Sequence, residues 1–446
     1  MRLSRLHLFV AFAFTVMADP VSSVAYAIEA ALRALDGDPA SLVATMALVV
    51  AIVAVIAATY HQLIGRFPTG GGGPKGIGEA FGEGWAFVPL GALLVDFTLT
   101  VAVSCSAGSA ALIAYLPELG SGRLPIALAL AVAVAVGVMV GHRGRIGFAL
   151  AAQGFLLVAA FVIVSGFLAE PAAEATSAGN GEPLLANASF VAVLFALPLG
   201  MALATGVEAP SDAIAQLPQL RDSGRRLFGR LTLWLMVGIV GGLTICFAVL
   251  AVRLGVPLPD GDSTLLAETA RESVGDGLPL AGFQGTSALL LLAAAASSFL
   301  AGSGVLKALA SVDSRGEGGL LPERFNRENR FLVAHWGVLA VLGVSAAMIV
   351  AARGEEQELV QFYAVSVFAS FLAATVGCAR LSLRDGRRRA AAINLLGAAL
   401  VGLVLALNLT RLDSVIALAA SGLVALYLWR AWVARGRPAG LLEAAG

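Results

Sequence analysis

Long apolar runs divide this chain into segments of the length that crosses a lipid bilayer. A spanning helix needs about 20 mostly apolar residues, and in lipid all its backbone polar groups must be bonded internally. The sequence contains twelve such runs, at 7–32, 42–64, 84–115, 124–141, 147–169, 188–215, 231–253, 287–310, 332–352, 359–380, 390–407 and 414–433. It therefore predicts an all-α integral membrane protein with twelve transmembrane helices.

The composition agrees with a membrane protein and excludes several other classes. Of the 446 residues, 59% are hydrophobic and 13% are charged, against about 25% charged in a soluble domain. The formal net charge is zero and therefore says nothing about acidic partners or nucleic acid; no nucleic-acid partner is expected. The four histidines are scattered near the ends of runs and form no metal or nucleophile–base pattern. We expect neither an enzyme nor a bound cofactor, and the lipid bilayer as the main partner.

The basic residues predict how the chain is oriented. Lysine and arginine concentrate in cytoplasmic loops of membrane proteins. Most of the 29 basic residues lie at the ends of runs that share one face with the N-terminus, including the arginine-rich loop 384–389. Both termini are therefore predicted to be cytoplasmic, in a multi-pass protein of the plasma membrane.

Two of the twelve runs carry acidic and helix-breaking residues at their centres. The first reads Ala18-Asp19-Pro20, and the sixth contains "LATGVEAPSDA", with Gly206 and Glu208 before a proline. A lone proline often makes only a kink whose freed carbonyl is bonded by neighbours. Interrupted helices five runs apart, however, are typical of a transporter binding site between two five-helix halves. We therefore predict that helices 1 and 6 are broken at mid-membrane, the first at Ala18–Pro20.

The third run has a polar stripe. Asp96, Thr100 and Ser104 are spaced four residues apart and so share one helix face. A carboxylate near a helix centre costs about 2.5 to 3.5 kcal/mol on insertion scales unless it is compensated. Lys307, which is the only lysine inside a run, lies near the end of that run. Asp19 and Asp96 thus lack an obvious basic partner, which leaves a bound cation or a proton.

Several of these patterns together resemble a known group of transporters. The segments are "ADPVSSVAYAIEAAL", "YHQLIGRFPTGGGGPKG", "LLVDFTLTVAVSCSAG", "ATGVEAPSDAI", "GLLPERFNRENR" and "FYAVSVFASF". They are similar to the amino acid/polyamine/organocation superfamily and, within it, to the KimA-type potassium–proton symporters related to KUP transporters. The resemblance implies a LeuT-like inverted five-plus-five repeat with two extra helices. It also implies a transport core at 1–380, followed at 381–446 by helices 11 and 12 and a short cytoplasmic tail.

The same resemblance implies a set of functional residues, and no cofactor beyond the transported K⁺ and H⁺. The implied ion-binding residues are Asp19, Tyr26, Asp96, Thr100, Ser104, Thr205 and Tyr363. Of these, Asp19, Asp96, Thr100, Ser104 and Thr205 would coordinate K⁺. The candidates for proton coupling are Asp19, Asp96 and Glu208, and a second ion site would use Ser297 and Ser298.

The sequence departs from the KimA pattern in three places. Proline follows Asp19 where a small or aliphatic residue is expected, and helix 8 matches poorly beyond Ser297, Ser298 and Phe299. The large cytoplasmic C-terminal domain used for dimer formation is not expected here, so a monomer or a weak dimer is predicted.

Proton-coupled potassium uptake is the function that these residues favour. The alternative is a proton-coupled permease for an amino acid or organic cation, in which Asp19 or Asp96 binds the substrate amine. Amino acid permeases of the superfamily usually have a glycine-rich break in helix 1 whose N–H groups hold the substrate carboxylate. An acid at that break would repel a carboxylate. A membrane sensor that binds a ligand without moving it is a third class.

Overall fold

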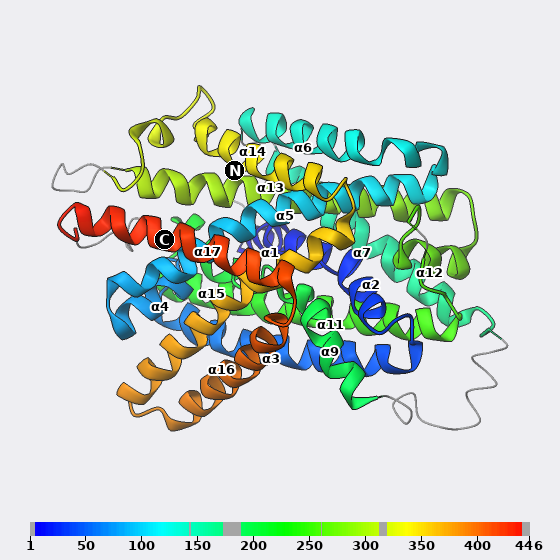
Figure 1. Ribbon diagram of the computed structural model, residues 1–446, viewed down its shortest axis with the longest axis horizontal. Coiled ribbons are helices and arrows are strands. Elements are labelled where there is room, and N and C mark those ends of the chain that lie inside the picture. The colour runs from blue at the N-terminus through cyan, green and yellow to red at the C-terminus, as the bar shows by residue number, and fades with distance from the viewer. Residues whose placement is uncertain (1–4, 142–143, 173–188, 260, 312–318, 439–446) are drawn as a thin grey trace.

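The computed structural model is an assembly of helices joined by turns and loops (Figure 1). It describes residues 5–141, 144–172, 189–259, 261–311 and 319–438. The helices of this part of the chain are α1 (Arg5–Ser22), α2 (Val24–Ala34), α3 (Leu42–Arg66), α4 (Gly72–Phe81), α5 (Phe87–Tyr115), α6 (Arg123–Met139), α7 (Gly144–Leu168), α9 (Phe190–Gly200), α10 (Ala209–Ala213), α11 (Asp222–Arg253), α12 (Leu265–Val274), α13 (Leu278–Ala310), α14 (His335–Ala351), α15 (Glu356–Arg384), α16 (Arg388–Asn408) and α17 (Leu412–Ala434). Short 3-10 helices are η1 (Pro39–Ser41), η2 (Glu83–Ala86), η3 (Pro117–Gly122), η4 (Met201–Ala204), η5 (Ile214–Gln216) and η6 (Glu323–Asn326). The described residues contain no strand, so the all-helical prediction is confirmed.

Eleven segments of the described chain are long and apolar enough to cross a membrane. They coincide with eleven of the twelve predicted runs. The remaining run, 332–352, corresponds to α14, which has only 17 residues. The segments that precede and follow α14 lie near opposite ends of α6. Asn329 donates a hydrogen bond to the Met139 carbonyl, whereas Gly354 packs against Leu124. Figure 1 shows α14 alongside α6. This is the path expected of a further crossing, and the count of twelve stays a prediction, as does the inverted repeat.

Helix α5 forms most of the span that is the most deeply buried of the described candidate spans. Nearly all its residues are buried, and it packs against α13, α15 and α17. A side chain at Gly91 would place its Cβ 2.7 Å from the Ala425 nitrogen and the Ser421 oxygen of α17. Such close backbone approach through small residues is how helices associate in lipid. On the outside of the bundle, leucines such as Leu395 and Leu423 remain exposed, as a lipid-facing surface requires.

The first span is interrupted at Ser23 instead of at Ala18–Pro20, so that prediction was wrong in position. Helix α1 continues through Asp19 and Pro20 to Ser22, because proline has a helix-compatible φ and removes only one backbone donor. The Ser22 hydroxyl donates to the Asp19 carbonyl at 2.7 Å, and the Ser23 hydroxyl donates to the Pro20 carbonyl at 2.6 Å. Serine side chains therefore take up backbone acceptors that a wider break would have exposed.

The predicted break in the sixth span is confirmed. Helix α9 ends at Gly200, and η4 then gives way to four turn residues, 205–208, before α10. Gly206 has φ +77°, in the left-handed region that glycine adopts without strain. Pro210 follows near the start of α10, where its missing N–H costs no hydrogen bond. Glycine and proline thus end one half-helix and begin the next.

A buried polar network joins α3, α15 and α16. The Asn394 side chain accepts hydrogen bonds from Thr59 (2.9 Å) and Gln62 (3.1 Å) and donates to Gln62 (3.0 Å) and Ser382 (3.2 Å). We predict that Asn394→Ala lowers the free energy of unfolding by about 1 to 3 kcal/mol, because it leaves buried polar partners unpaired. Thermal unfolding in detergent measures this. Leu395→Ala, at a 52% exposed position on the same helix, is the control and should change little. Equal losses in the two variants would contradict a role for the network.

Candidate functional site

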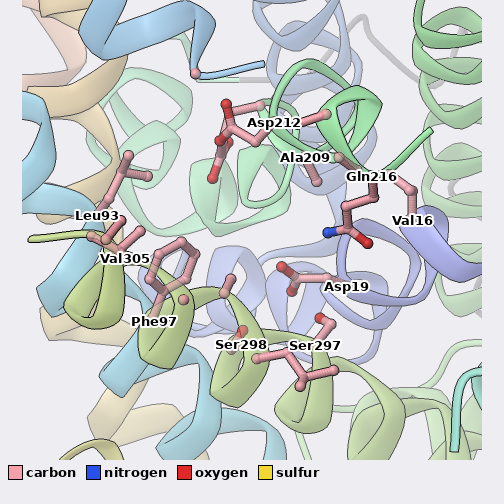
Figure 2. A pocket seen from close by; sticks show the side chains of 18 of the residues that line it. Val16, Asp19, Leu93, Phe97, Ala209, Asp212, Gln216, Ser297, Ser298 and Val305 are labelled. Carbon is pink, nitrogen blue, oxygen red and sulfur yellow. The ribbon is translucent and has the colours of Figure 1, made fainter. Parts of the chain in front are cut away.

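A cavity of about 440 Å³ lies between the first, third, sixth and eighth spans. Figure 2 shows Asp19 from α1 and Gln216 from η5 directed into this space, with Ser297 and Ser298 of α13 opposite them. The apolar part of the wall comes from α5 and α13 and includes Phe97. The cavity therefore has an acidic, hydroxyl-containing side and an apolar side.

The cavity extends from Asp19 toward one face of the bundle. Its lining residues come from the N-terminal portions of spans one and three and the C-terminal portions of spans six and eight. Successive spans run in opposite directions, so all four portions share the face that carries the N-terminus. Gly71 and Pro74, just beyond the end of α3, line the cavity at the same end.

Asp19 and Pro20 pack directly against the break in the sixth span. A Cβ on Gly206 would lie 2.8 Å from Pro20 Cδ and 3.3 Å from Asp19 Oδ2. The Ser23 hydroxyl also lies 3.3 Å from the Leu203 carbonyl. The two interruptions thus face each other, and Pro20 forms part of the surface that receives Gly206. Asp19 Oδ1 is buried and has no hydrogen-bond partner in the described part of the chain.

Two further carboxyl groups, on Glu208 and Asp212, line the cavity. The Glu208 carboxyl group accepts a hydrogen bond from the Gly206 backbone. It lies close enough to Asp212 and Asp19 for their negative charges to interact with it. Asp212 is attracted by the charge of Lys75 and hydrogen bonds with the Gly71 backbone. Asp212 was not among the predicted site residues. Its spacing of four from Glu208, which places both on one helix face, was the signal available in the sequence.

The Asp96 stripe is buried behind the cavity. Asp96, Thr100 and Ser104 are 2%, 1% and 0% exposed, and they do not line the cavity. Asp96 is close enough to Glu208 and Asp19 for their charges to interact. Asp96 Oδ1 and Ser104 Oγ lack hydrogen-bond partners among the described residues. The stripe thus places an acid and a hydroxyl group next to the site, but these side chains are not exposed to the cavity.

The other predicted residues have different surroundings. The Thr205 hydroxyl donates to the Ala202 carbonyl at 3.0 Å, within the break itself. Tyr26 is 1% exposed and lies on α2, beyond Asp19 toward the opposite face. The side chain of Tyr363, within α15, lies outside what the structure describes. Ser297 donates to the Ala294 carbonyl at 2.9 Å, whereas Ser298 Oγ is buried without a hydrogen-bond partner in the described chain.

The structure therefore brings part of the predicted set together. Asp19, Glu208, Ser297 and Ser298, which the sequence assigned to separate ion and proton sites, line one cavity. Gln216, at the end of η5, also lines it and had no signal in the sequence. No salt bridge in the described chain involves Asp19, Asp96, Glu208 or Asp212 within 4 Å, and only Lys75 offers a nearby positive charge. A bound cation or protons can balance the remaining negative charge.

Comparison with known proteins places this arrangement among membrane transporters. The model of a family described as amino acid permease matches residues 6–425. The potassium transporter KimA of Bacillus subtilis (strain 168) is 30% identical over 377 residues, which are 80% of this chain and 59% of that relative. The chain thus spans somewhat less than two thirds of the length of the relative.

Proposed function

From the premise that the chain belongs to the amino acid permease family, we propose that it is a secondary active transporter that takes up K⁺ together with protons. Family membership and its many apolar helices make it a multi-pass membrane transporter. The ion, the coupling to protons, the plasma membrane and the cytoplasmic termini are parts of the proposal, as is the monomeric or weakly dimeric state.

The observation that carries this proposal is the sign of the charge at the cavity. Three carboxyl groups, from Asp19, Glu208 and Asp212, line it, and Asp96 lies behind it. Such a site attracts cations and repels the carboxylate of an amino acid. Carboxylate, hydroxyl and carbonyl oxygens are hard donors that suit alkali cations. Similarity to a protein named a potassium transporter adds support for K⁺.

In the mechanism that we propose, Asp19 holds the ion. Ser297, Ser298 and Gln216 provide neutral oxygens in the same cavity, and Glu208 with Asp96 binds the coupled proton. If Glu208 and Asp96 are both protonated, one of them by the coupled proton, and Asp212 is balanced by the charge of Lys75, only Asp19 stays ionised and the K⁺-loaded site is close to neutral, as a low-dielectric interior requires. Each positive charge that moves inward gains about 2.3 kcal/mol per 100 mV of membrane potential. If the N-terminus is cytoplasmic, the cavity of this structure is the release path into the cell.

Cavity size favours a second candidate, a proton-coupled permease for an organic cation or an amino acid. A volume of about 440 Å³ far exceeds that of a bare K⁺ ion and falls within the range of small-molecule pockets, about 300 to 1,000 Å³. Asp19 would then bind the substrate amine against the apolar wall of α5.

Uptake into proteoliposomes tests these two functions. We expect the purified full-length chain to accumulate radioactive Rb⁺. Excess K⁺ should compete with this uptake, and the uptake should respond to an imposed inward proton gradient. Polyamines and amino acids are added separately as competitors. Protein-free liposomes, and proteoliposomes treated with a protonophore, are the controls. Rb⁺ uptake that K⁺ does not compete, or that a polyamine or amino acid displaces at low concentration, would replace the first function by the second.

A further inference from the structure

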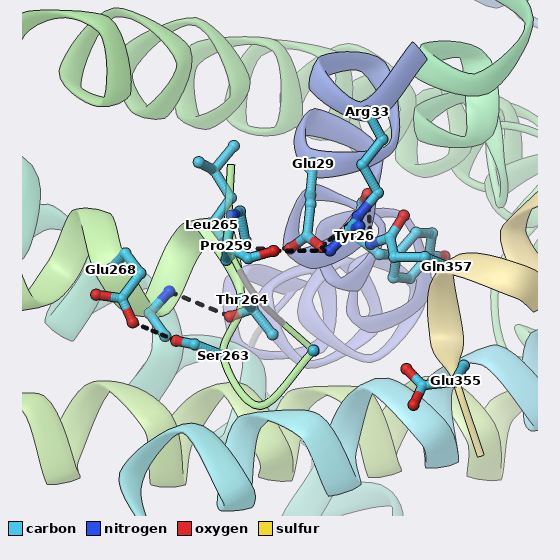
Figure 3. Close-up of polar contacts among 12 residues, drawn as sticks. Tyr26, Glu29, Arg33, Pro259, Ser263, Thr264, Leu265, Glu268, Glu355 and Gln357 are labelled. Carbon is cyan, nitrogen blue, oxygen red and sulfur yellow. Dashed lines mark hydrogen bonds and ion pairs between the residues drawn. The ribbon is translucent and has the colours of Figure 1, made fainter. Parts of the chain in front are cut away.

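A second group of charged residues lies on the face opposite to the cavity, and Figure 3 shows the contacts that Glu29 and Arg33 make within it. It joins the C-terminal part of span one, the start of α6, the loop before α12 and the start of α15. Because these parts lie at the opposite ends of their spans from the cavity lining, the cavity and this group are on different sides of the break. We call the group of Glu29, Arg33, Arg123, Glu355 and Glu356 the outer cluster.

Helix α2 is attached to the loop before α12 through Glu29 and Arg33. Glu29 is 1% exposed; its Oε1 lies 2.8 Å from Arg33, and its Oε2 accepts a hydrogen bond from the Leu265 N–H at 2.8 Å. Leu265 is the first residue of α12, so this bond satisfies one of the free N–H groups of that helix. Arg33 also donates to the Pro259 carbonyl at 3.1 Å. These bonds must break if α2 and α12 separate.

A second ion pair connects α6 to the start of α15. Arg123, whose side chain is 7% exposed, pairs with Glu355 and also donates to the Gly261 carbonyl. Glu355 itself remains 45% exposed. Each arginine of the outer cluster therefore already has a carboxylate partner, and one acid, Glu356, is left over.

Glu356 is buried at 3% exposure, and its Oε2 has no hydrogen-bond partner in the described part of the chain. It is near enough to Glu29, Arg123 and Glu355 for their charges to interact. Other ionisable side chains near this end of α15 include Arg353 before the helix, Glu358 within it, Tyr26 and Arg33 of α2, Tyr115 of α5, and Arg411 and Asp413, which interact with each other at the turn before α17. The position at the start of α15 favours an anion by only about 0.3 to 1 kcal/mol at a surface site, less than the cost of burying an unpaired charge.

We propose that Glu356 is an outer proton-binding site, which takes up a proton when the outer cluster closes over it and releases the proton when that face opens to water. This inference rests on the proposed function only in requiring that the protein alternate between two open faces. The closed arrangement contains three acids and two arginines, so one added proton makes it neutral. A proton from outside would then stabilise closure behind a loaded ion, in addition to any proton bound at Glu208 or Asp96.

The direction of the pH effect follows from this preference. A proton that binds the closed state better than the open state shifts the population toward closure as the external pH falls. In alkaline medium Glu356 ionises, and the open state, in which water can solvate the carboxylate, gains population.

Cysteine accessibility tests the proposal without any transported ion. Ala267 of α12, which packs near α2, is 0% exposed, so Ala267→Cys reports opening, whereas Leu278→Cys at an 86% exposed position corrects for the pH dependence of the reagent. Both are made in the full-length chain with Cys105, Cys246 and Cys378 replaced by serine, and an impermeant maleimide is applied outside right-side-out vesicles. We expect the labelling ratio of the buried to the exposed position to fall about fivefold or more from mildly alkaline to acidic medium, the size of an ordinary coupling between sites.

Variants of Glu356 decide whether this residue is the sensor. Glu356→Gln should give a low ratio at every pH, Glu356→Asp should keep the dependence with a shifted midpoint, and Glu355→Gln should keep it with Glu356 intact. The proposal is overturned if the parent ratio does not change with pH, or if Glu356→Gln still responds. If Glu356→Gln does not insert, an unshifted midpoint in Glu356→Asp overturns it. Failure of Rb⁺ uptake with a pH-dependent ratio would reject the proposed ion and leave the proton site standing.

Discussion

Asp19→Asn is expected to reduce the initial rate of Rb⁺ uptake at least about 100-fold, because it removes the carboxylate proposed to bind the ion. Breaking a buried charge pair costs about 3 to 5 kcal/mol, which corresponds to roughly 100- to 4,000-fold at 1.4 kcal/mol for each factor of ten. The amide is nearly isosteric, so the contacts of Pro20 with Gly206 should persist. Initial rates in proteoliposomes at equal reconstituted protein measure the effect.

The matched control for Asp19→Asn is Asp222→Asn. Asp222 is a carboxylate at the start of α11 whose side chain is 61% exposed, and it lies 3.8 Å from Arg225 in a surface ion pair. Surface pairs contribute about 0 to 1 kcal/mol, so uptake should stay near that of the parent. An Asp19→Asn protein with parental uptake and parental competition by K⁺ would remove Asp19 from the site. Stabilisation of the parent by added K⁺, measured as a rise in the unfolding temperature and lost in Asp19→Asn, would separate binding from a later step.

Gly206→Ala is expected to abolish transport and to destabilise the protein by about 2 to 5 kcal/mol. Two costs combine: the left-handed backbone, about 1 to 2 kcal/mol for a residue with a Cβ, and the crowding of a new methyl group, about 1 to 3 kcal/mol. The methyl group would sit 2.8 Å from Pro20 Cδ, and the proline ring cannot rotate away. The first and sixth spans would have to separate at Asp19. Thermal unfolding in detergent and Rb⁺ uptake measure the two consequences.

Gly238→Ala is the control for the glycine variant. Gly238 lies within α11, and a Cβ there would meet nothing within 4 Å. Alanine is a better helix former than glycine by about 0.5 to 1 kcal/mol, so stability should be equal or slightly higher. A Gly206→Ala protein with the parental unfolding temperature and uptake would show that the two breaks can shift apart freely, and that their contact does not position Asp19.

The helices were predictable because apolar length alone determines where a chain can cross a bilayer. The exact place of the first interruption was not. Asp19-Pro20 drew attention as a helix breaker, yet Ser22 and Ser23 bond the Asp19 and Pro20 carbonyls and move the interruption to Ser23. Hydroxyl groups two and three residues after the proline were visible in the sequence, but whether they bond backward depends on side-chain rotamers. In the sixth span, Gly206 and Pro210 act together, so the break fell where it was predicted.

The site was predictable where local spacing decided it and unpredictable where packing did. The common face of Asp96, Thr100 and Ser104 follows from helical periodicity, and all three side chains are buried as a group. That they lie behind the cavity instead of lining it results from how α13 packs on α5, which no local pattern encodes. The same packing brings Ser298 into one cavity with Asp19 and Glu208. Gln216 joins them because α10 packs against α1 and η5 follows α10 directly.

The apolar wall beside Asp19 has a pharmacological consequence. Leu90, Leu93 and Phe97 of α5 and Leu300 and Val305 of α13 line the same cavity as the carboxyl groups. An amphiphilic drug with one ammonium group and an apolar tail can contact both the carboxyl groups and the apolar wall. A hydrated metal ion can contact only the carboxyl groups. Because the outer cluster closes the opposite face, blockers of this kind should inhibit when they are added to the face that carries the N-terminus. Added to the other face, they should inhibit only weakly until the protein changes to the conformation that opens there.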